Sequence, residues 1–141
     1  MQRVRIVTAE ERLSAANNKT SLAIFGLPGV GKTTLLKTLP ADKTVCLDLE
    51  AGMKSVQDWP GASIPVRGFG DFRDLAVLIG GADPAADPNA YYSERHYQHV
   101  RSVYAGSGIE EFLAAKPIIF VDSITDLTRQ AMVFARQQPE A

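Results

Sequence analysis

Runs of apolar residues are separated by polar stretches in a pattern that predicts alternating strands and helices. Compact apolar runs with the length of buried strands cover residues 21–25, 44–49, 63–66 and 117–121. Apolar residues at helical spacing predict helices over residues 32–39, 71–79, 91–104, 109–115 and from Ser123 onward. The strands are apolar throughout instead of at every second residue, which favours a parallel sheet covered by helices on both faces. The pattern therefore predicts an α/β fold.

The first 19 residues precede this alternating pattern and are predicted to form an N-terminal extension. A short β-like run covers residues 4–7, and Thr8 and Glu11 have the spacing of a capping box that begins a helix ending near residue 16. The core domain is predicted to cover residues 20–141. Within it, residues 80–89 are rich in Gly, Pro and Asp, and we expect an exposed loop there, interpreted as a disordered insertion, with a lid as the alternative.

Composition and charge narrow the classes of function. Lys and Arg number 15 against 16 Asp and Glu, so no global basic surplus indicates nucleic-acid binding, and any DNA contact would come from a local patch. The apolar runs are too short to span a membrane, and the N-terminus lacks the apolar segment of a signal peptide. The single cysteine, Cys46, has no partner for an internal disulfide. We expect a protein of a reducing cytoplasm.

Residues 26–33 carry the strongest chemical signal, because they fit the pattern G-x-x-x-x-G-K-[ST] between a predicted strand and a predicted helix. The candidate phosphate-binding residues are Gly26, Leu27, Pro28, Gly29, Val30, Gly31, Lys32, Thr33 and Thr34. Glycines let backbone N–H groups approach triphosphate oxygens, and a helix N-terminus favours anions. In this pattern Lys32 contacts the β- and γ-phosphates, Thr33 is a ligand for Mg²⁺, and Thr34 is a candidate contact to the α-phosphate.

Two carboxylates are expected at the edge of the sheet where α/β proteins bind ligands. Asp122 directly follows the apolar run 117–121, and we expect it to reach the Mg²⁺ coordination sphere through water; the alternative is a helix-capping role. Glu50 follows the strand over 44–49 and is the candidate to orient or deprotonate the attacking water. Asp48 is the rival candidate for that role, and the alternative for Glu50 is a solvated loop residue.

Three segments in order resemble the RecA-like branch of P-loop ATPases: GLPGVGKTT (26–34), VCLDLEAG (45–52) and PIIFVDSITDL (117–127). The chain is more closely similar to phage-encoded AAA/RecA-type ATP-binding proteins, some of which accompany single-strand annealing proteins in recombination. The stretches YYSERHYQHVRSVY and ITDLTRQAMVFARQQPEA also resemble that group.

The resemblance implies a P-loop NTPase with a RecA-like, mostly parallel sheet that binds and hydrolyses Mg²⁺–ATP. It implies catalytic roles for Glu50 and Lys32 and a Mg²⁺ site at Thr33 and Asp122. It also implies a homo-oligomer in the cytoplasm of a bacterial host, with single-stranded DNA and a phage recombination protein as partners. Arg129 and Arg136 are candidates to reach a neighbouring subunit's site. Such cores have further strands after the one ending at Asp122, so we expect this chain to be an N-terminal portion with an incomplete core.

Three other functions remain open. A nucleotide-kinase-like phosphotransferase shares the glycine-rich loop but needs an arginine-rich lid, and the 80–104 region offers only Arg95 and Arg101. A non-catalytic ATP-binding switch would signal occupancy to a partner. A DNA-binding module would use the tyrosines of residues 91–104 to stack bases, and the alternative for those tyrosines is core packing.

The remaining candidates have a structural and a functional interpretation. His96 and His99 have the spacing of a metal-binding pair on a helix, or they are surface residues. Cys46 lies inside an apolar strand and is interpreted as a small core residue. Trp59 follows Glu50 in a predicted loop, where it would pack near a nucleotide base or at a subunit interface.

Overall fold

The computed structural model describes residues 6–14 and 19–138, and the chain forms two compact units, Met1–Val30 and Gly31–Ala141. In the first unit, the predicted capping box is confirmed at the start of α1 (Ala9–Ser14). The backbone N–H of Thr8 donates to Glu11 Oε2 at 3.0 Å, and the N–H of Glu11 donates to Thr8 Oγ1 at 3.2 Å. Residues 4–5 of the β-like run and residues 15–16 of the predicted helix lie outside the described residues.

The predicted strand over residues 21–25 is not present, because residues 19–27 form neither helix nor strand. A strand needs a hydrogen-bonded neighbour for its backbone groups. Among the described residues, every strand pairing involves segments of the second unit alone. Leu22 and Phe25 are 80% and 90% exposed. Residues 21–25 therefore have the composition of a buried strand, but they have no pairing partner among the described residues.

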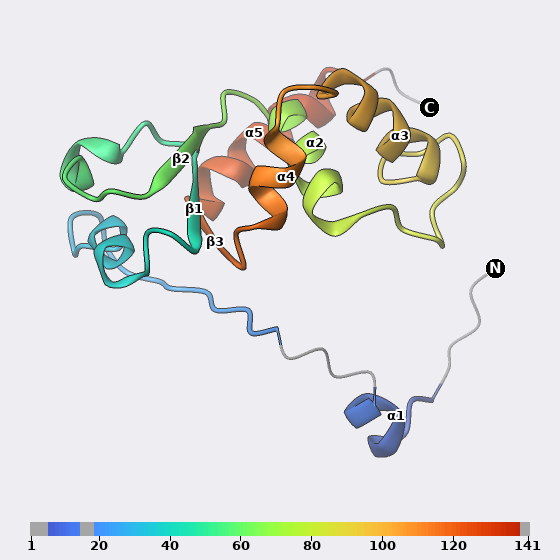
Figure 1. The fold of residues 1–141 in the computed structure, drawn as a ribbon, viewed down its shortest axis with the longest axis horizontal. Helices are drawn as coiled ribbons and strands as arrows, with labels where there is room; N and C mark the ends of the chain where they lie inside the picture. The colour runs from blue at the N-terminus through green and yellow to red at the C-terminus, as the bar shows by residue number, and fades with distance from the viewer. Residues whose placement is uncertain (1–5, 15–18, 139–141) are drawn as a thin grey trace. The chain divides into compact units, whose positions relative to one another are not determined.

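The second unit contains a parallel sheet of β1 (Thr44–Asp48), β2 (Ala62–Pro65) and β3 (Ile118–Asp122). The strand order among the described residues is β2-β1-β3, so β1 lies in the centre (Figure 1). In the register, Val45 of β1 pairs with both Ala62 and Ile119. The predicted strands over 44–49, 63–66 and 117–121 are confirmed to within one residue at each end, and their parallel arrangement is confirmed as well.

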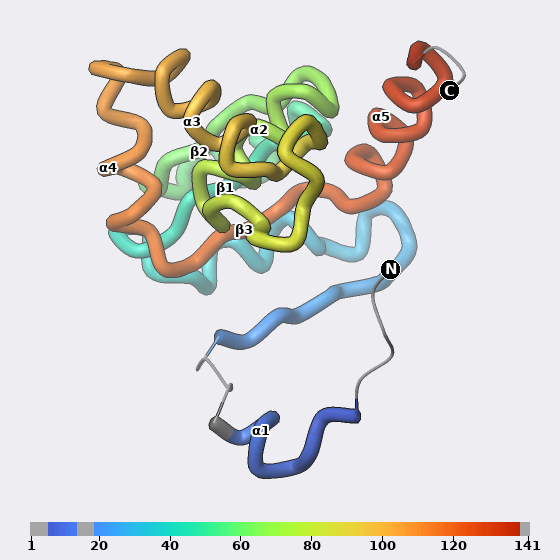
Figure 2. The backbone as a smooth tube through the Cα atoms, turned by 90° about the vertical axis from the view of Figure 1, so that its right-hand side faces the viewer, coloured from blue at the N-terminus to red at the C-terminus, as the bar shows by residue number. Residues whose placement is uncertain are grey.

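Helices cover both faces of this sheet. They are η1 (Thr33–Thr38), η2 (Met53–Val56), α2 (Phe69–Gly80), α3 (Glu94–Val103), α4 (Ile109–Ala114) and α5 (Ile124–Arg136). The helix predicted over 32–39 forms as a 3-10 helix. The chain passes directly from β3 into α5 (Figure 2). The structure thus confirms the predicted α/β fold with a parallel sheet.

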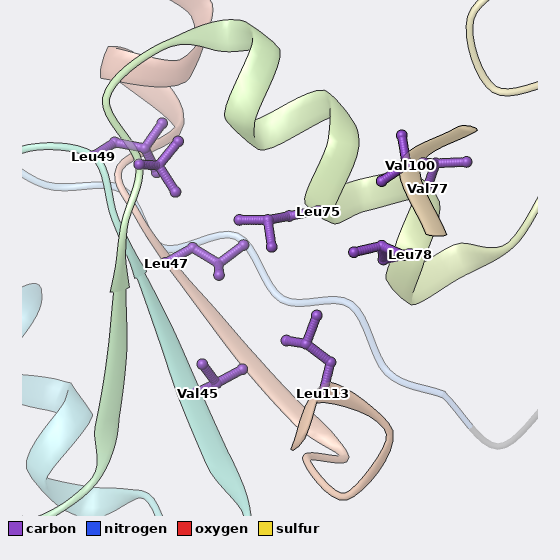
Figure 3. Close-up of a cluster of buried hydrophobic side chains, with 9 residues drawn as sticks. Val45, Leu47, Leu49, Leu75, Val77, Leu78, Val100 and Leu113 are labelled. Atoms are coloured by element: carbon purple, nitrogen blue, oxygen red, sulfur yellow. The ribbon is translucent and has the colours of Figure 1, made fainter. Parts of the chain in front are cut away.

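The side chains of β1 alternate between two apolar clusters. Val45 and Leu47 point toward Leu75 of α2, in a cluster that also takes residues from α3 and α4 (Figure 3). Cys46, between them in sequence, points to the opposite face because successive strand residues alternate. There it packs in a second group, here called the Leu36 cluster, which consists of Leu36, Cys46, Val56 and Trp59.

The Leu36 cluster anchors η1 to the sheet. Leu36 is fully buried, and burying a leucine side chain contributes about 1.5–3 kcal/mol. Trp59 is 7% exposed within this cluster, so it is a core residue in this structure. The start of η1, which carries Thr33, is therefore held against the face of the sheet that also carries Cys46.

Candidate functional site

The carboxyl ends of β1 and β3 bring two acids together at one edge of the sheet. Asp48 and Asp122 are direct partners in the parallel register, and they are only 7% and 5% exposed. Both lie on the same face as Cys46, since positions two apart in a strand share a face. Burial, together with the negative charges of Asp122 and Asp48, raises the pKa of Cys46 to about 12. Two carboxylates are therefore buried side by side at this edge of the sheet.

Thr33 meets Asp122 at this edge. The Thr33 Oγ1 hydroxyl donates a hydrogen bond to Asp122 Oδ2 at 2.6 Å, although 89 residues separate the two in sequence. Both side chains offer oxygen atoms, which are the ligands that Mg²⁺ prefers. No three His, Cys, Asp or Glu side chains within the described ranges form a metal-holding group. A magnesium ion here would therefore draw its other ligands from phosphate oxygens and water.

Two glycines of the glycine-rich segment, Gly29 and Gly31, have positive φ angles. Gly29, in the first unit, has a φ of 80°, and Gly31, in the second, has a φ of 93°. Positive φ values are accessible to glycine at little cost. In the first unit the N–H of Val30 donates to the Leu27 carbonyl at 3.4 Å, and a methyl group on Gly26 would lie 2.8 Å from Val30 Cγ2. In the second unit, Lys32 stands at the N-cap of η1.

Glu50 and Asp48 occupy one tight turn but have different environments. The N–H of Gly52 donates to Asp48 Oδ1 at 3.1 Å, so the Asp48 carboxylate closes the turn. The N–H of Leu49 donates to the Asp122 carbonyl at 2.8 Å, which ties the start of the turn to β3. Glu50 is exposed. Of the two rival carboxylates, Asp48 is buried and accepts a hydrogen bond from the backbone of its own turn, whereas Glu50 faces solvent at the same edge of the sheet.

Ser123 connects the Glu50 turn to α5. Ser123 caps α5, because the N–H of Asp126 donates to Ser123 Oγ at 3.4 Å. The same hydroxyl donates to Glu50 Oε1, a contact that the sequence pattern does not indicate. Asp126 in turn accepts a hydrogen bond from Arg129, whose side chain is 73% exposed. No local sequence signal could have paired Ser123 with Glu50, since they are 73 residues apart.

Of the histidine and tyrosine candidates, His96, Tyr97 and Tyr104 make contacts inside the protein. His96 Nδ1 accepts a hydrogen bond from the N–H of Tyr92 at 3.0 Å, and His96 Nε2 lies 3.3 Å from Asp74 Oδ1. His99 is exposed and forms no metal-holding group with His96 within the described residues. Tyr97 and Tyr104 pack against the cluster around Leu75. The contacts of Tyr97 and Tyr104 agree with the packing interpretation of the tyrosines. The interpretation of both histidines as surface residues holds for His99 but not for His96, whose side chain is only 10% exposed.

The two arginines of the 80–104 region have partners on the same surface. Arg95 Nη1 donates to Asn89 Oδ1 at 2.9 Å, and Arg101 Nε lies 2.9 Å from Glu110 Oε1. Loop residues 81–92 are tied down as well, since the N–H of Asp83 donates to the carbonyl of Tyr92 at 2.8 Å. In this structure, therefore, neither arginine extends from the loop as a kinase lid requires.

Comparison with known proteins adds the family to this geometry. A family model described as "AAA domain" matches residues 18–141. No curated protein and no solved structure matches the chain at a significant level. Within the described residues, no helix has the length and apolar character needed to cross a membrane.

Proposed function

The chain belongs to the AAA domain family, and from that premise we propose that it binds Mg²⁺–ATP at residues 26–34 and hydrolyses it. Membership of this family indicates nucleotide binding and ATPase activity. The observation that best supports the proposal is the Thr33–Asp122 hydrogen bond at the carboxyl edge of the sheet. This bond joins Thr33, at the end of the glycine-rich segment, to Asp122, the last residue of the apolar strand β3. A hydroxyl and a carboxylate that meet in this way suit magnesium–nucleotide binding.

Each residue has a defined role in the proposed reaction. Within residues 26–34, the backbone N–H groups, which every residue except Pro28 has, bind the phosphates, and the Lys32 ammonium neutralises charge that develops on the γ-phosphate oxygens. Thr33 and Asp122 would hold Mg²⁺, which when bound would neutralise phosphate charge. A water oxygen attacks the γ-phosphorus, and the bond from that phosphorus to the β–γ bridging oxygen breaks. Glu50 accepts a proton from this water, so ADP and inorganic phosphate leave.

The environment of the two rival acids supports Glu50 as the proton acceptor. A general base must be able to approach the water that it activates. Glu50 is exposed at the carboxyl edge, whereas Asp48 is 7% exposed and accepts a hydrogen bond from Gly52. We therefore assign proton transfer to Glu50 and the shape of the turn to Asp48.

Substitution of Glu50 by Gln tests the ATPase proposal. We expect E50Q to lower kcat by about 10²–10⁴-fold, a typical contribution of a general base, with little change in ATP affinity. Lys32→Ala should abolish magnesium-dependent ATP binding in calorimetry. The matched control is Glu94→Gln, because Glu94 is an exposed glutamate that bonds only a neighbouring side chain of its own helix, Gln98.

Other outcomes would favour the alternative functions. A nucleotide kinase would barely respond to E50Q and would transfer phosphate to a nucleotide acceptor. A non-catalytic switch would bind ATP without turnover in the presence or absence of single-stranded DNA. Wild-type protein that fails to bind magnesium–ATP would overturn the whole proposal.

We further propose that the ATPase serves phage DNA recombination as a homo-oligomer in the bacterial cytoplasm, with single-stranded DNA and a recombination protein as partners. The support is the sequence resemblance of residues 91–104 and 124–141 to that phage group. Exposed Arg129 and Arg136 on α5 are candidates to reach a neighbouring subunit's nucleotide. Binding to single-stranded DNA should weaken steeply as salt rises, because phosphate contacts release counterions; affinity that ignores salt would contradict the DNA partner.

A further inference from the structure

We propose that Ser123 is a positioning residue for Glu50, holding the glutamate carboxylate at the carboxyl edge of the sheet from the first residue before α5. This inference rests on the proposed ATPase function. It assigns Ser123 a task beyond helix capping, since the same hydroxyl caps α5 and bonds the proposed base. Ser123 would not touch the nucleotide, and it would act through Glu50 alone.

The hydrogen bonds around Ser123 leave its proton for Glu50. A serine hydroxyl has one proton to donate and two lone pairs to accept with. The N–H of Asp126 donates to Ser123 Oγ, which occupies one lone pair. Ser123 Oγ lies 3.3 Å from Asp126 Oδ2 and also bonds Glu50 Oε1. Arg129 already donates a hydrogen bond to the Asp126 carboxylate. The serine proton is therefore assigned to the Glu50 carboxylate.

The charges at the start of α5 favour this arrangement. Burial acts to raise the pKa of Asp126, but the pKa is lowered on balance, and the hydrogen bond from Arg129 is the largest cause of that lowering. Asp126 is therefore ionised at neutral pH, and Arg129 compensates its charge. The Asp126 carboxylate also lies in the first turn of α5, where the helix dipole favours an anion. The backbone N–H of Asp126 holds the hydroxyl of Ser123, and that hydroxyl in turn bonds Glu50.

Loss of the hydroxyl should affect turnover rather than nucleotide binding. Glu50 is exposed, so without Ser123 its carboxylate would sample several rotamers, of which few face the attacking water. Small losses of orientation in an active site lower rates by up to about 10²-fold. We expect Ser123→Gly to lower kcat by about 10- to 100-fold while KM for ATP changes by less than about twofold.

Three variants separate positioning from helix capping. Glycine is tolerated at an N-cap nearly as well as serine, so S123G removes the hydroxyl with little loss of the cap. Ser123→Thr keeps a hydroxyl and should restore most of the turnover. Ser93→Gly is the matched control, because the Ser93 hydroxyl caps α3 by accepting from the N–H of His96 at 3.3 Å and no carboxylate bonds it in the described contacts.

The test combines steady-state kinetics with urea denaturation of S123G, S123T, S93G, E50Q and the double variant E50Q/S123G. Support requires that S123G lowers kcat, that S123T and S93G remain within about threefold of wild type, and that S123G has no further effect on kcat beside E50Q. Equal kcat values for S123G and S93G would overturn the inference. A wild-type protein without ATPase activity would instead overturn the proposed function.

Denaturation midpoints provide a readout that does not depend on turnover. If Ser123 bonds Glu50, the midpoint shifts of S123G and E50Q should be non-additive in the double variant, because each single change already removes the shared contact. Strictly additive shifts would overturn the positioning role even where the protein hydrolyses ATP. The two readouts together distinguish a failed positioning role from a failed ATPase assignment.

Discussion

Gly61 lies where no side chain can fit, which makes Gly61→Ala a sharp test of the Leu36 cluster. A methyl group on Gly61 would lie 2.1, 2.2 and 2.6 Å from Trp59 Cη2, Cζ2 and Cζ3. Ordinary van der Waals contact begins near 3.4 Å, so the indole ring would have to move by more than about 1 Å. The ring is only 7% exposed and packs against Leu36, Cys46 and Val56.

The expected cost follows from this overlap. Overpacking in a well-packed core typically costs about 1–3 kcal/mol, and here the obstacle is a rigid ring with buried neighbours behind it. With a urea m-value of about 2 kcal/mol per M, the unfolding midpoint should fall by about 0.5–1.5 M. Because Trp59 and Leu36 share one cluster, we also expect η1 and Thr33 to lose support and the affinity for nucleotide to fall.

Urea denaturation provides the assay, and the single tryptophan, Trp59, provides a fluorescence probe inside the perturbed cluster. Far-UV circular dichroism should be recorded in parallel, since G61A alters the surroundings of the fluorophore itself. The matched control is Gly80→Ala at the end of α2, where a methyl group meets nothing within 4 Å. A G61A midpoint equal to those of wild type and G80A would refute the described packing of Trp59 on Gly61.

Four other predictions follow from buried or strained positions. Cys46 is fully buried and burial raises its pKa to about 12, so iodoacetamide at pH 8 should alkylate it at least about 10³-fold more slowly in the folded protein than in the unfolded chain; equal rates in mass spectrometry would contradict this burial. Leu36→Ala should cost about 2–5 kcal/mol in urea denaturation, and a cost below 1 kcal/mol would argue against its complete burial. Asp122→Asn should weaken magnesium-dependent nucleotide binding at least about tenfold in calorimetry, whereas unchanged affinity would exclude Asp122 from the metal site. Ala51→Gly should raise the free energy of unfolding by about 0.5 kcal/mol, because Ala51 has a φ of 56°; a destabilised variant would contradict this reading of the turn.

Features encoded by neighbouring residues could be predicted from the sequence. Two helix caps depend on residues that are three apart in sequence, and both are present. One is the capping box of Thr8 and Glu11, and the other is the cap of α5, in which Ser123 accepts from the N–H of Asp126. The uniformly apolar strands indicated a parallel sheet, because a strand buried on both faces has no polar side. The glycines at 26, 29 and 31 indicated a loop whose backbone can take positive φ, and Gly29 and Gly31 do so whereas Gly26 does not.

Features that need a distant partner could not be predicted in the same way. The apolar composition of residues 21–25 favours a strand, yet strand formation depends on a neighbour to bond with, and the described residues provide none. The sequence position of Trp59 left a nucleotide base and a subunit interface open as its surroundings, because it does not reveal the cluster that encloses the ring. The 3-10 form of η1 also differs from the expected helix type, and local spacing alone does not distinguish the two.

The candidate site shows most clearly which features depend on neighbouring residues and which depend on the tertiary structure. The residue types at Thr33, Glu50 and Asp122 marked them as candidates, because oxygen ligands and carboxylates suit magnesium and proton transfer. The parallel register, which pairs Asp48 with Asp122, set their relative positions and left Glu50 beside Ser123. Such contacts join residues 73 and 89 positions apart. Residue chemistry is therefore readable along the chain, whereas which groups meet depends on how strands pair and how helices pack.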